Sequence, residues 1–408
     1  KVIHLNHSDI SGGAARATYR IHHSLRYAGV DSRMWVNKAT AGDWTVEGPA
    51  TKGRKALAAV RGRAVSPLVK TLKTGNPIIH SPAILPSQWV KRINTSDADI
   101  VHLHWVQGEM LSIANIGRIQ KPIVWTLHDM WAFCGAEHYT EDHRWRDGYR
   151  RDNRPSHESG FDLNRWTWQR KRKHWQRPMH IVTPSQWLAD CVRVSTLMSD
   201  WPVDVVSYPI DIDRWSSIEK NLARELLGLP QGVPLLLFGA MGGARDPRKG
   251  FDLLINALDQ LDKQIPGLEL VIFGQLEPMS KPDLGFPIHY AGHLHDNISL
   301  RVLYSAADVY ALPSRQDNLP LTCMESLSCG TPVVAFNTSG PPSMVEHKKT
   351  GYLADAFDAK DFARGITHLI DHCADGNFGK SARVYAERCF SPNIIANQYL
   401  DIYKKVLA

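Results

Sequence analysis

Long apolar runs and paired cysteines are both missing from this chain of 408 residues. No stretch approaches the roughly 18 consecutive apolar residues that a membrane-spanning helix needs. The six cysteines form no CxxC pair, which fits a reducing cytoplasm and argues against a disulfide framework or a zinc ribbon. The first residues, Lys1–Leu5, read as a strand and lack the basic-then-apolar layout of a signal peptide. We therefore expect a globular protein of the cytoplasm.

Acidic residues are also scarce in the first half of the chain. Residues 1–207 contain 29 Lys and Arg against 18 Asp and Glu, whereas the remainder contains 19 against 23. This asymmetry predicts an anionic partner, or a basic surface for another reason, in the first half only. With 43% apolar and 22% charged residues the composition is that of a globular protein, and the length predicts two domains.

The order of local patterns is strand, glycine turn, helix, strand, repeated along the chain. In the first half, apolar segments that read as buried strands begin at Lys1, Asp99, Pro122 and His180. In the second half they begin at Pro234, Leu268, Asp308 and Pro332, with a helix over residues 251–261. Alternation of this kind predicts parallel sheets with helices on both faces.

Two such sheets in tandem predict a doubly wound α/β protein with a cleft between its two domains. The segment Val203–Pro209 reads as the link, so we expect one domain over residues 1–207 and a second over 208–390. Residues 391–408 are predicted to form a helix that packs back on the first domain. Ligands of open α/β sheets bind beyond the carboxyl ends of the strands, which makes the cleft the expected site.

The most informative segment runs from Leu312 to Val334 and reads as strand, polar loop, helix and strand. Asp317 precedes the helix and Glu325 lies inside it, so their backbones are on the order of 10 Å apart. Such a pair cannot share a proton, but it can hold two ends of an elongated ligand. The amides of the loop and the helix N-terminus would then face a phosphate between the two acids.

This segment resembles the E-x7-E signature of the family-4 retaining glycosyltransferases, whose GT-B fold consists of two facing Rossmann-like domains. Residues 11–14 resemble the glycine loop of that family, and residues 246–251 resemble its basic phosphate-binding turn. Residues 125–131 and 314–320 resemble a subgroup that builds bacterial surface polysaccharides, including colanic acid and O-antigen. Four motifs in the family's order make the resemblance specific.

The resemblance implies a donor site for a nucleoside diphosphate sugar. Glu325 would bind the ribose hydroxyls, a task that suits a carboxylate, and Asp317, where the family has Glu, would bind the transferred sugar. Lys249 would neutralise the diphosphate as the sugar–phosphate bond breaks. Further donor contacts are expected from Gly13, Arg245, Arg248, Asn318, Leu319, Pro320 and Leu321. Which of the two arginines serves is left open by the spacing.

Gly12 and Gly13 predict a turn where the backbone approaches a phosphate or the acceptor closely. The sequence there is not G-x-G-x-x-G, and no acidic residue closes a second strand some 20 residues on, which disfavours a dinucleotide oxidoreductase.

His128 ends a buried strand and, by the resemblance, lies near the reacting carbon, where it positions sugar hydroxyls as a catalytic residue together with Lys249 and Asp317. His102 and His104 alternate with apolar residues and share one face of their strand; we interpret them as structural or cleft-lining. His138 and His143 lack a convincing ligand spacing, so no metal and no cofactor are predicted.

Residues 144–177 contain 11 Lys and Arg with four tryptophans among them. Basic charge with tryptophan is typical of a segment at a membrane interface, and equally of a site for the pyrophosphate of a lipid-linked acceptor. A second basic stretch, Lys52–Lys73, favours the membrane interpretation. A solvated helix with structural tryptophans is the remaining interpretation, and no nucleic-acid-binding module is recognised.

The sequence thus predicts a metal-independent retaining glycosyltransferase that acts on a UDP- or GDP-sugar and a lipid-linked or other glycan acceptor in bacterial surface polysaccharide synthesis. We expect it on the inner face of the plasma membrane. The alternatives are an inactive glycan- or nucleotide-binding protein on the same scaffold and a basic-surface nucleic-acid-binding protein. Among enzymes, an epimerase or a phosphorylase is the nearest competitor.

Overall fold

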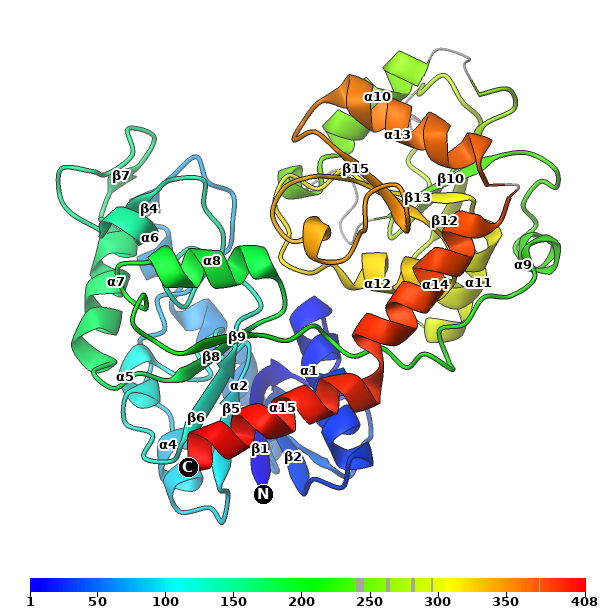
Figure 1. Ribbon diagram of the computed structural model, residues 1–408. Helices are drawn as coiled ribbons and strands as arrows, with labels where there is room; N and C mark the ends of the chain where they lie inside the picture. The colour runs from blue at the N-terminus through cyan, green and yellow to red at the C-terminus, as the bar shows by residue number, and fades with distance from the viewer. Residues whose placement is uncertain (240–245, 262–264, 280–282, 295, 374) are drawn as a thin grey trace. The chain divides into compact units, whose positions relative to one another are not determined.

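The computed structural model describes residues 1–239, 246–261, 265–279, 283–294, 296–373 and 375–408. The chain forms two compact units, each built on a parallel sheet (Figure 1). Unit 1 comprises Lys1–Pro209 with Ile395–Ala408, and unit 2 comprises Ile210–Ile394. Arg245 falls between the described ranges. No helix among the described residues is both long and apolar enough to cross a bilayer.

Unit 1 contains a seven-stranded parallel sheet in the order β3-β2-β1-β5-β6-β8-β9. Its strands are β1 (Val2–Ser8), β2 (Ser32–Lys38), β3 (Val46–Glu47), β5 (Ile100–Leu103), β6 (Ile123–Thr126), β8 (His180–Thr183) and β9 (Val203–Val205). A small antiparallel pair joins β4 (Leu72–Lys73) to β7 (Ser159–Gly160). The helices are α1 (Gly13–Tyr27), α2 (Lys52–Ala64), α3 (Ser66–Val69), α4 (Trp89–Asn94), α5 (Ile113–Ile116), α6 (Arg144–Asp147), α7 (Leu163–His174), α8 (Gln186–Val194) and most of α15 (Pro392–Leu407).

The two faces of this sheet differ in chemistry. Apolar side chains of β1, β5, β6 and β8 pack with those of α4, α5 and α8 into the main core, which includes Leu103, Trp125 and Ile181. Alternate residues on the same strands point to the opposite face and contact α1 and α15. Figure 1 shows α15 as the red helix that crosses the strands. Hydrogen bonds from Tyr403 to His102 and between Tyr399 and Thr126 hold α15 on that face.

Unit 2 contains a six-stranded parallel sheet in the order β12-β11-β10-β13-β14-β15. Its strands are β10 (Leu235–Gly239), β11 (Glu269–Phe273), β12 (Ile288–Gly292), β13 (Val309–Leu312), β14 (Val333–Phe336) and β15 (Gly351–Ala354). The helices are α9 (Lys220–Leu226), α10 (Phe251–Leu261), α11 (Asn297–Ala306), α12 (Leu321–Ser328), α13 (Ala359–Asp371) and α14 (Asn377–Phe390), with short 3-10 turns η2 (Pro247–Lys249) and η3 (Pro341–Ser343). The core lies between the sheet and helices α10 and α13.

The predicted α/β class with two parallel sheets is therefore confirmed, and each strand that the sequence indicated in the described ranges is present. In both sheets, the loops that follow the carboxyl ends of the central strands carry predicted site residues.

Candidate functional site

The predicted donor acids lie in the segment that runs from the end of β13 through α12. The strand ends at Leu312 and the helix begins at Leu321, with Pro320 as its N-cap. Asp317 therefore lies in the loop and Glu325 in the helix, as the sequence indicated. The positive φ of +78° at Gly330 ends this helical segment before β14 begins.

A second loop, which follows β14, holds the first loop in place. The amide of Asp317 donates to Ser339 Oγ at 3.2 Å, and the amide of Gly340 donates to the Asp317 carbonyl at 2.9 Å. A Cβ at position 340 would lie only 1.4 Å from the carbonyl oxygen of Asn318, so the contact requires glycine. Asn318 and Leu319 are buried by this packing. The backbone that precedes α12 is thus fixed on both sides.

The basic turn η2 is tied to the same loop. Asp246 caps the turn by accepting from the amide of Arg248, and Gly250 leaves it with a φ of +66°. A Cβ at position 250 would meet the Pro313 carbonyl at 1.9 Å. The amide of Arg315 donates to the Arg248 carbonyl at 2.7 Å. These contacts place the turn against the loop that contains Asp317.

Lys249 and Asp317 form an ion pair, with Nζ 2.6 Å from Oδ2. Both side chains are partly accessible to solvent. The pair joins the predicted phosphate-binding cation to the predicted sugar-binding acid across 68 residues of sequence. Arg248 instead pairs with Asp246 at 2.8 Å, while Arg245 lies outside the described residues, so which arginine assists Lys249 stays a prediction.

Glu325 is buried, with 2% of its surface exposed. The hydroxyl of Tyr304 donates to Glu325 Oε2 at 3.4 Å. Burial, reinforced by the charge of Glu325, raises the pKa of the Tyr304 hydroxyl well above its usual value, so the phenol keeps its proton and remains a donor. Asp317 and Glu325 accordingly have different partners and do not form a dyad.

In unit 1, Gly12 and Gly13 form the start of α1. Gly12 has a φ of +97°, a conformation that favours glycine, although a Cβ on either residue would meet no atom within 4 Å. The first turn contains no acidic residue and the N-cap offers no side-chain hydrogen bond. The backbone here is shaped as the sequence indicated, while its ligand stays a prediction.

His128 follows β6 and is partly exposed. Its Nδ1 lies 2.6 Å from the Tyr208 hydroxyl, and its Nε2 lies 3.2 Å from Nδ1 of His104 and 3.5 Å from Thr18 Oγ1. Burial lowers the pKa of His128 to about 4, so the ring is neutral near pH 7. A neutral imidazole can orient a hydroxyl but is a poor general acid.

The neighbouring Asp129 has a structural task. It accepts from the Trp105 indole at 3.0 Å and from the Trp131 amide at 2.9 Å, and it contacts His138 Nδ1 at 2.6 Å. His138 is thereby engaged by protein groups.

Nitrogen atoms of His4, His102 and His104 also approach one another. However, His4 Nδ1 and His104 Nε2 are 2.9 Å apart and hydrogen bonded, whereas a shared zinc ion would hold them about 3.3 Å apart.

The basic segment 144–177 is more deeply buried than its composition suggested. Lys171 is fully buried in α7, and its ammonium donates to the carbonyls of Trp131, Cys134 and Gly135. Arg144 is buried against Asp142 and Glu158. Trp168 and Trp175 belong to the interior as well. Trp168 and Trp175 are therefore structural, as one interpretation predicted, whereas the buried Lys171 and Arg144 contradict a fully solvated helix.

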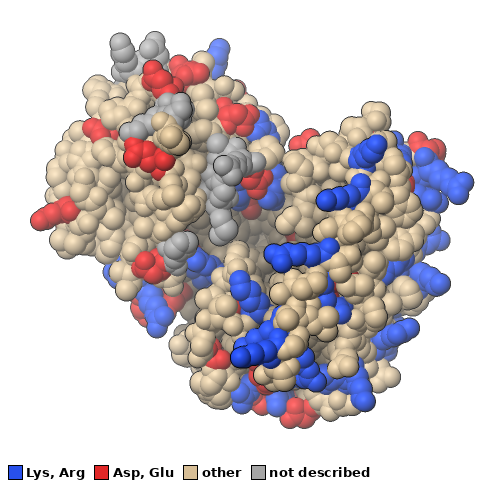
Figure 2. Space-filling model, turned by 180° about the vertical axis from the view of Figure 1, so that it is seen from behind, with Lys and Arg blue, Asp and Glu red and all other residues tan. Residues whose placement is uncertain are grey.

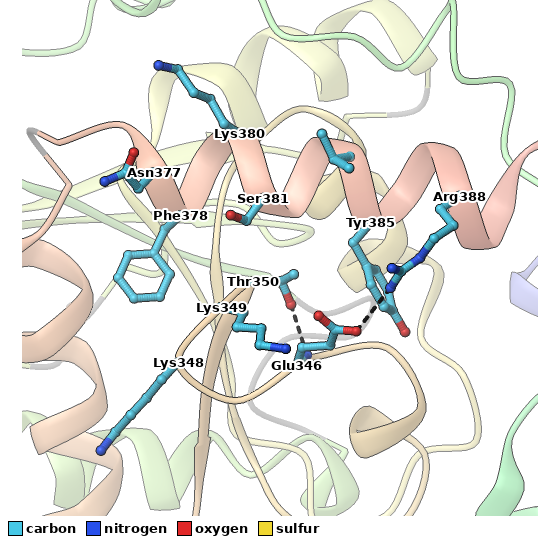
Figure 3. A pocket seen from close by; sticks show the side chains of 11 residues that line it. Glu346, Lys348, Lys349, Thr350, Asn377, Phe378, Lys380, Ser381, Tyr385 and Arg388 are labelled. Atoms are coloured by element: carbon cyan, nitrogen blue, oxygen red, sulfur yellow. Dashed lines mark hydrogen bonds and ion pairs between the residues drawn. The ribbon is translucent and has the colours of Figure 1, made fainter.

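A cavity of about 480 Å³ lies elsewhere in unit 2, between α14 and the residues that precede β15 (Figure 3). Its walls include Glu346, Lys348, Lys349, Lys380 and Arg388. None of the residues that line it was predicted from the sequence. The cavity therefore does not coincide with the loops that hold Lys249, Asp317 and Glu325.

Some residues that the sequence analysis did not single out contact the predicted ones, among them Tyr304, Ser339 and Tyr208. Each lies at least 21 residues from its partner in the chain. No local pattern marks such contacts, because they depend on how neighbouring strands bring their loops together.

Two family models match the chain. Residues 11–214 match the model described as Glycosyltransferase Family 4, and residues 229–384 match Glycosyl transferases group 1. The chain belongs to glycosyltransferase family 4. The resemblance that the motifs indicated is confirmed at the level of the family, and the GT-B fold is confirmed by solved structures.

Curated relatives include proteins named D-inositol 3-phosphate glycosyltransferase. The protein from Saccharomonospora viridis is 30% identical over 227 residues, covering 50% of this chain and 51% of the relative. That from Mycobacteroides abscessus is 30% identical over 217 residues, covering 50% and 47%. The chain thus spans about half the length of the curated relatives it matches.

Solved structures with the same fold cover nearly the whole chain. Sucrose-phosphate synthase of Thermosynechococcus elongatus superposes with a TM-score of 0.66 at 17% identity, covering 100% of this chain and 99% of that one. Anabaena HepE in complex with UDP-glucose gives 0.63 at 16% identity, covering 99% of both chains. WaaG, a glycosyltransferase involved in lipopolysaccharide biosynthesis, gives 0.63 at 15% identity, again covering 99% of both.

Proposed function

We propose that this family-4 protein is a retaining, metal-independent glycosyltransferase that moves a sugar from a UDP- or GDP-sugar to a lipid-linked or other glycan acceptor. The observation that carries the proposal is the Lys249–Asp317 ion pair, whose acid lies on the loop that leads to α12 and Glu325. A cation for a leaving diphosphate and a carboxylate for a polyol are the two groups that donor binding needs. Family membership and the UDP-glucose complex of HepE support this assignment.

In this proposal each donor group has its own residue. Glu325 accepts hydrogen bonds from the ribose hydroxyls, and Lys249 binds the diphosphate, assisted by Arg245 or Arg248. Asp317 binds the hydroxyls of the transferred sugar, and the backbone of residues 318–321 with Gly13 lines the donor. The ion pair keeps both side chains near their working positions until phosphate replaces Asp317 as the partner of Lys249.

The proposed chemistry needs no metal because Lys249 supplies the positive charge. As the sugar–phosphate bond breaks, negative charge grows on the diphosphate, and a fixed cation stabilises that charge more in the transition state than in the ground state. The leaving phosphate then helps to deprotonate the acceptor hydroxyl on the same face of the sugar, which retains the anomeric configuration. His128 orients sugar hydroxyls without exchanging protons.

Helix α2 supports an acceptor at a membrane surface. None of its residues is buried, and Leu57 and Val60 are 60% and 53% exposed beside Lys52, Arg54 and Lys55. The helix is held to unit 1 through Arg61, which donates to the carbonyls of Glu109, Leu85 and Pro86. Exposed apolar residues among basic ones are typical of a helix that lies on anionic lipid.

Basic side chains are also spread widely over the face of unit 1 seen in Figure 2, where acidic ones are sparse. Such a surface suits the phosphates of anionic lipid or of a lipid-linked acceptor. We propose that the protein works on the inner face of a bacterial plasma membrane in surface polysaccharide synthesis, with a substrate like those of the colanic acid and O-antigen subgroup.

A thermal-shift screen against UDP, GDP, ADP and their common sugars tests the donor site. A ligand that binds the native state alone raises the melting temperature by mass action. One nucleotide should stabilise the wild type, and Glu325→Ala should abolish the shift. Glu346→Ala is the control, because this acid of unit 2 pairs with Arg388 and lines a cavity whose walls include neither Lys249, Asp317 nor Glu325. No shift with any nucleotide would favour the inactive-scaffold alternative.

Co-sedimentation with vesicles of phosphatidylglycerol and phosphatidylcholine tests the membrane surface. The wild type should bind anionic vesicles, and the double substitution Leu57→Ser with Val60→Ser should release it. Val384→Ser serves as the control, since Val384 is equally exposed but lies in unit 2. Binding to RNA that is stronger than binding to these vesicles would favour the nucleic-acid alternative instead.

A further inference from the structure

A line of histidines crosses three adjacent strands of unit 1 and ends at His128. His4 on β1 is the register partner of His102 on β5, and β5 pairs in turn with β6. Because alternate residues of a strand share a face, His4, His102, His104, Thr126 and His128 all lie on the face that meets α1 and α15. Their neighbours in sequence form the apolar core on the opposite face.

Three of these rings form one hydrogen-bonded chain. His4 Nδ1 lies 2.9 Å from His104 Nε2, and His104 Nδ1 lies 3.2 Å from His128 Nε2. The chain continues through His128 Nδ1 to the Tyr208 hydroxyl at 2.6 Å. Burial lowers the pKa of all three imidazoles, so each ring is neutral and has a single N–H to donate. In such a chain the direction of one hydrogen bond fixes the direction of the others.

Thr18 sets that direction. Its hydroxyl donates its one proton to the Ala14 carbonyl at 2.8 Å, so only the oxygen lone pairs face His128 Nε2 at 3.5 Å. If Nε2 of His128 donates toward Thr18 Oγ1, it carries the proton of the ring and His104 Nδ1 accepts it. His104 consequently donates from Nε2 to His4 Nδ1. Nδ1 of His128 is left as an acceptor, which takes the proton of the Tyr208 hydroxyl.

We propose that His104 and His4 are positioning residues that hold the proton of His128 on Nε2, so that Nδ1 acts only as a hydrogen-bond acceptor for a hydroxyl. In the structure this hydroxyl belongs to Tyr208. A hydroxyl of the transferred sugar can bind there only after Tyr208, which is buried, turns away from Nδ1, a step that rests on the function proposed above. The arrangement selects a ligand with an O–H at this position and excludes proton transfer from His128.

The burial of His4 supports a role beyond packing. Its Nε2 has no hydrogen-bond partner among the described residues, although the ring is fully buried. An unbonded polar atom in the interior costs stability that an apolar side chain of similar size would avoid. The bond that His4 does make is the one to His104. The imidazole at position 4 therefore contributes to the hydrogen-bonded chain of histidines and not to the stability of the core.

His102 is a matched control within the same layer. It is as deeply buried as His104, and the two rings stack with their centroids 4.2 Å apart. However, its nitrogens contact the Tyr403 hydroxyl and Thr126 Oγ1, each at 2.7 Å, and so lie outside the chain. A substitution at position 102 disturbs packing to a similar degree without breaking the link to His128.

NMR of the full chain with 15N-labelled histidine rings tests the proposal without any ligand. Spectra of His4→Gln, His104→Gln and His128→Gln assign the resonances. We expect protonated Nε2 and unprotonated Nδ1 in His104 and His128, with scalar couplings across both N–H···N bonds. A proton on Nδ1 of His128, or the absence of coupling between His128 and His104, would overturn the proposal.

Substitutions at position 104 test the effect on His128. His104→Asn keeps an acceptor oxygen near the position of Nδ1, whereas His104→Leu removes it. With UDP-glucose as the probe donor, kcat for its cleavage should fall about 10-fold in His104→Leu, with KM within about twofold, and recover within about threefold in His104→Asn. His102→Leu should stay within about threefold of the wild type.

The two failures are distinguishable. If the wild type does not cleave UDP-glucose, the functional proposal fails for that donor. The tautomer of His128 in His104→Leu then still shows whether the hydrogen-bonded histidines position the proton of His128. If the tautomer and kcat are both unchanged in His104→Leu, His104 is not a positioning residue.

Discussion

Acid should destabilise unit 1 far more than its net charge suggests, because of four histidines on one face of its sheet and His22 of α1, which packs on that face. Burial lowers the pKa of each, to about 3 for His22, to about 4 for His128, and well below the usual value for His4, His102 and His104. In the unfolded chain each titrates near its usual pKa of about 6.5. At pH 5.5 the folded state therefore stays neutral while the unfolded state gains protons.

The sign and size of the effect follow from linkage. A base whose pKa is lower in the folded state binds more protons when unfolded, so stability is complete above pH 6.5 and is lost as the pH falls below it. Between pH 7 and pH 5.5 each such histidine costs about 1.2 kcal/mol. Five together cost about 6 kcal/mol, which is comparable with the whole stability of a typical domain.

Urea unfolding followed by tryptophan fluorescence measures this loss in the intact chain. Twelve of the 13 tryptophans lie in unit 1 and only Trp215 lies in unit 2, so the signal reports the unit that contains the histidines. The free energy of unfolding should fall by several kcal/mol between pH 7 and pH 5.5. A curve that is flat over this range would refute the account of the buried histidines.

Substitution of one buried histidine, compared with substitution of an exposed one, distinguishes the effect of the buried histidines on stability from that of the other titrating groups. His22 contacts Ser32 Oγ and Thr45 Oγ1 at 2.7 and 2.8 Å, and His22→Gln keeps an amide near the second contact. This variant should lose about 1.2 kcal/mol less than the wild type between pH 7 and pH 5.5. His157→Gln is the control, since His157 is exposed in the native structure. Identical losses in both variants would contradict the assignment.

Three further predictions concern other parts of the chain. Lys249→Ala should raise the Kd of the bound nucleotide at least about 10-fold in calorimetry, whereas Lys220→Ala, which breaks another Lys–Asp pair of unit 2, should leave it within about twofold. Lys171→Leu should lower the free energy of unfolding by about 1–3 kcal/mol, because three buried carbonyls lose their donor, while exposed Lys173→Leu should change it by less than about 0.5 kcal/mol. Gly340→Ala should abolish nucleotide binding, because its Cβ would displace Asn318, whereas Gly53→Ala, with open space around it, should bind normally.

The sequence predicted the parts of the fold that local patterns determine. The helix predicted over residues 251–261 is present, and the strand, loop and helix around Asp317 appear as expected. Alternation of His102 and His104 with apolar residues correctly indicated a shared face. Each of these features depends on neighbours within a few positions of the chain.

Contacts between distant segments were beyond the sequence. The histidine chain depends on the register between β1 and β5, whose paired residues are 98 positions apart. Tyr304 reaches Glu325 from a different helix. Lys171 lies in a run of four basic residues. It is buried because it lies on the side of α7 that faces Trp131, whereas Lys173 is exposed. Composition alone cannot tell these two lysines apart.

Cleavage of a sugar nucleotide tests the central proposal most directly. We would follow by NMR the full chain incubated with the UDP- or GDP-sugar that stabilises it, beside Lys249→Ala and the control Lys220→Ala. The account predicts release of the nucleoside diphosphate with retention at the anomeric carbon, slowed about 100-fold in Lys249→Ala and unchanged in Lys220→Ala. An intact donor in the wild type, or equal rates in Lys249→Ala and the wild type, would contradict it.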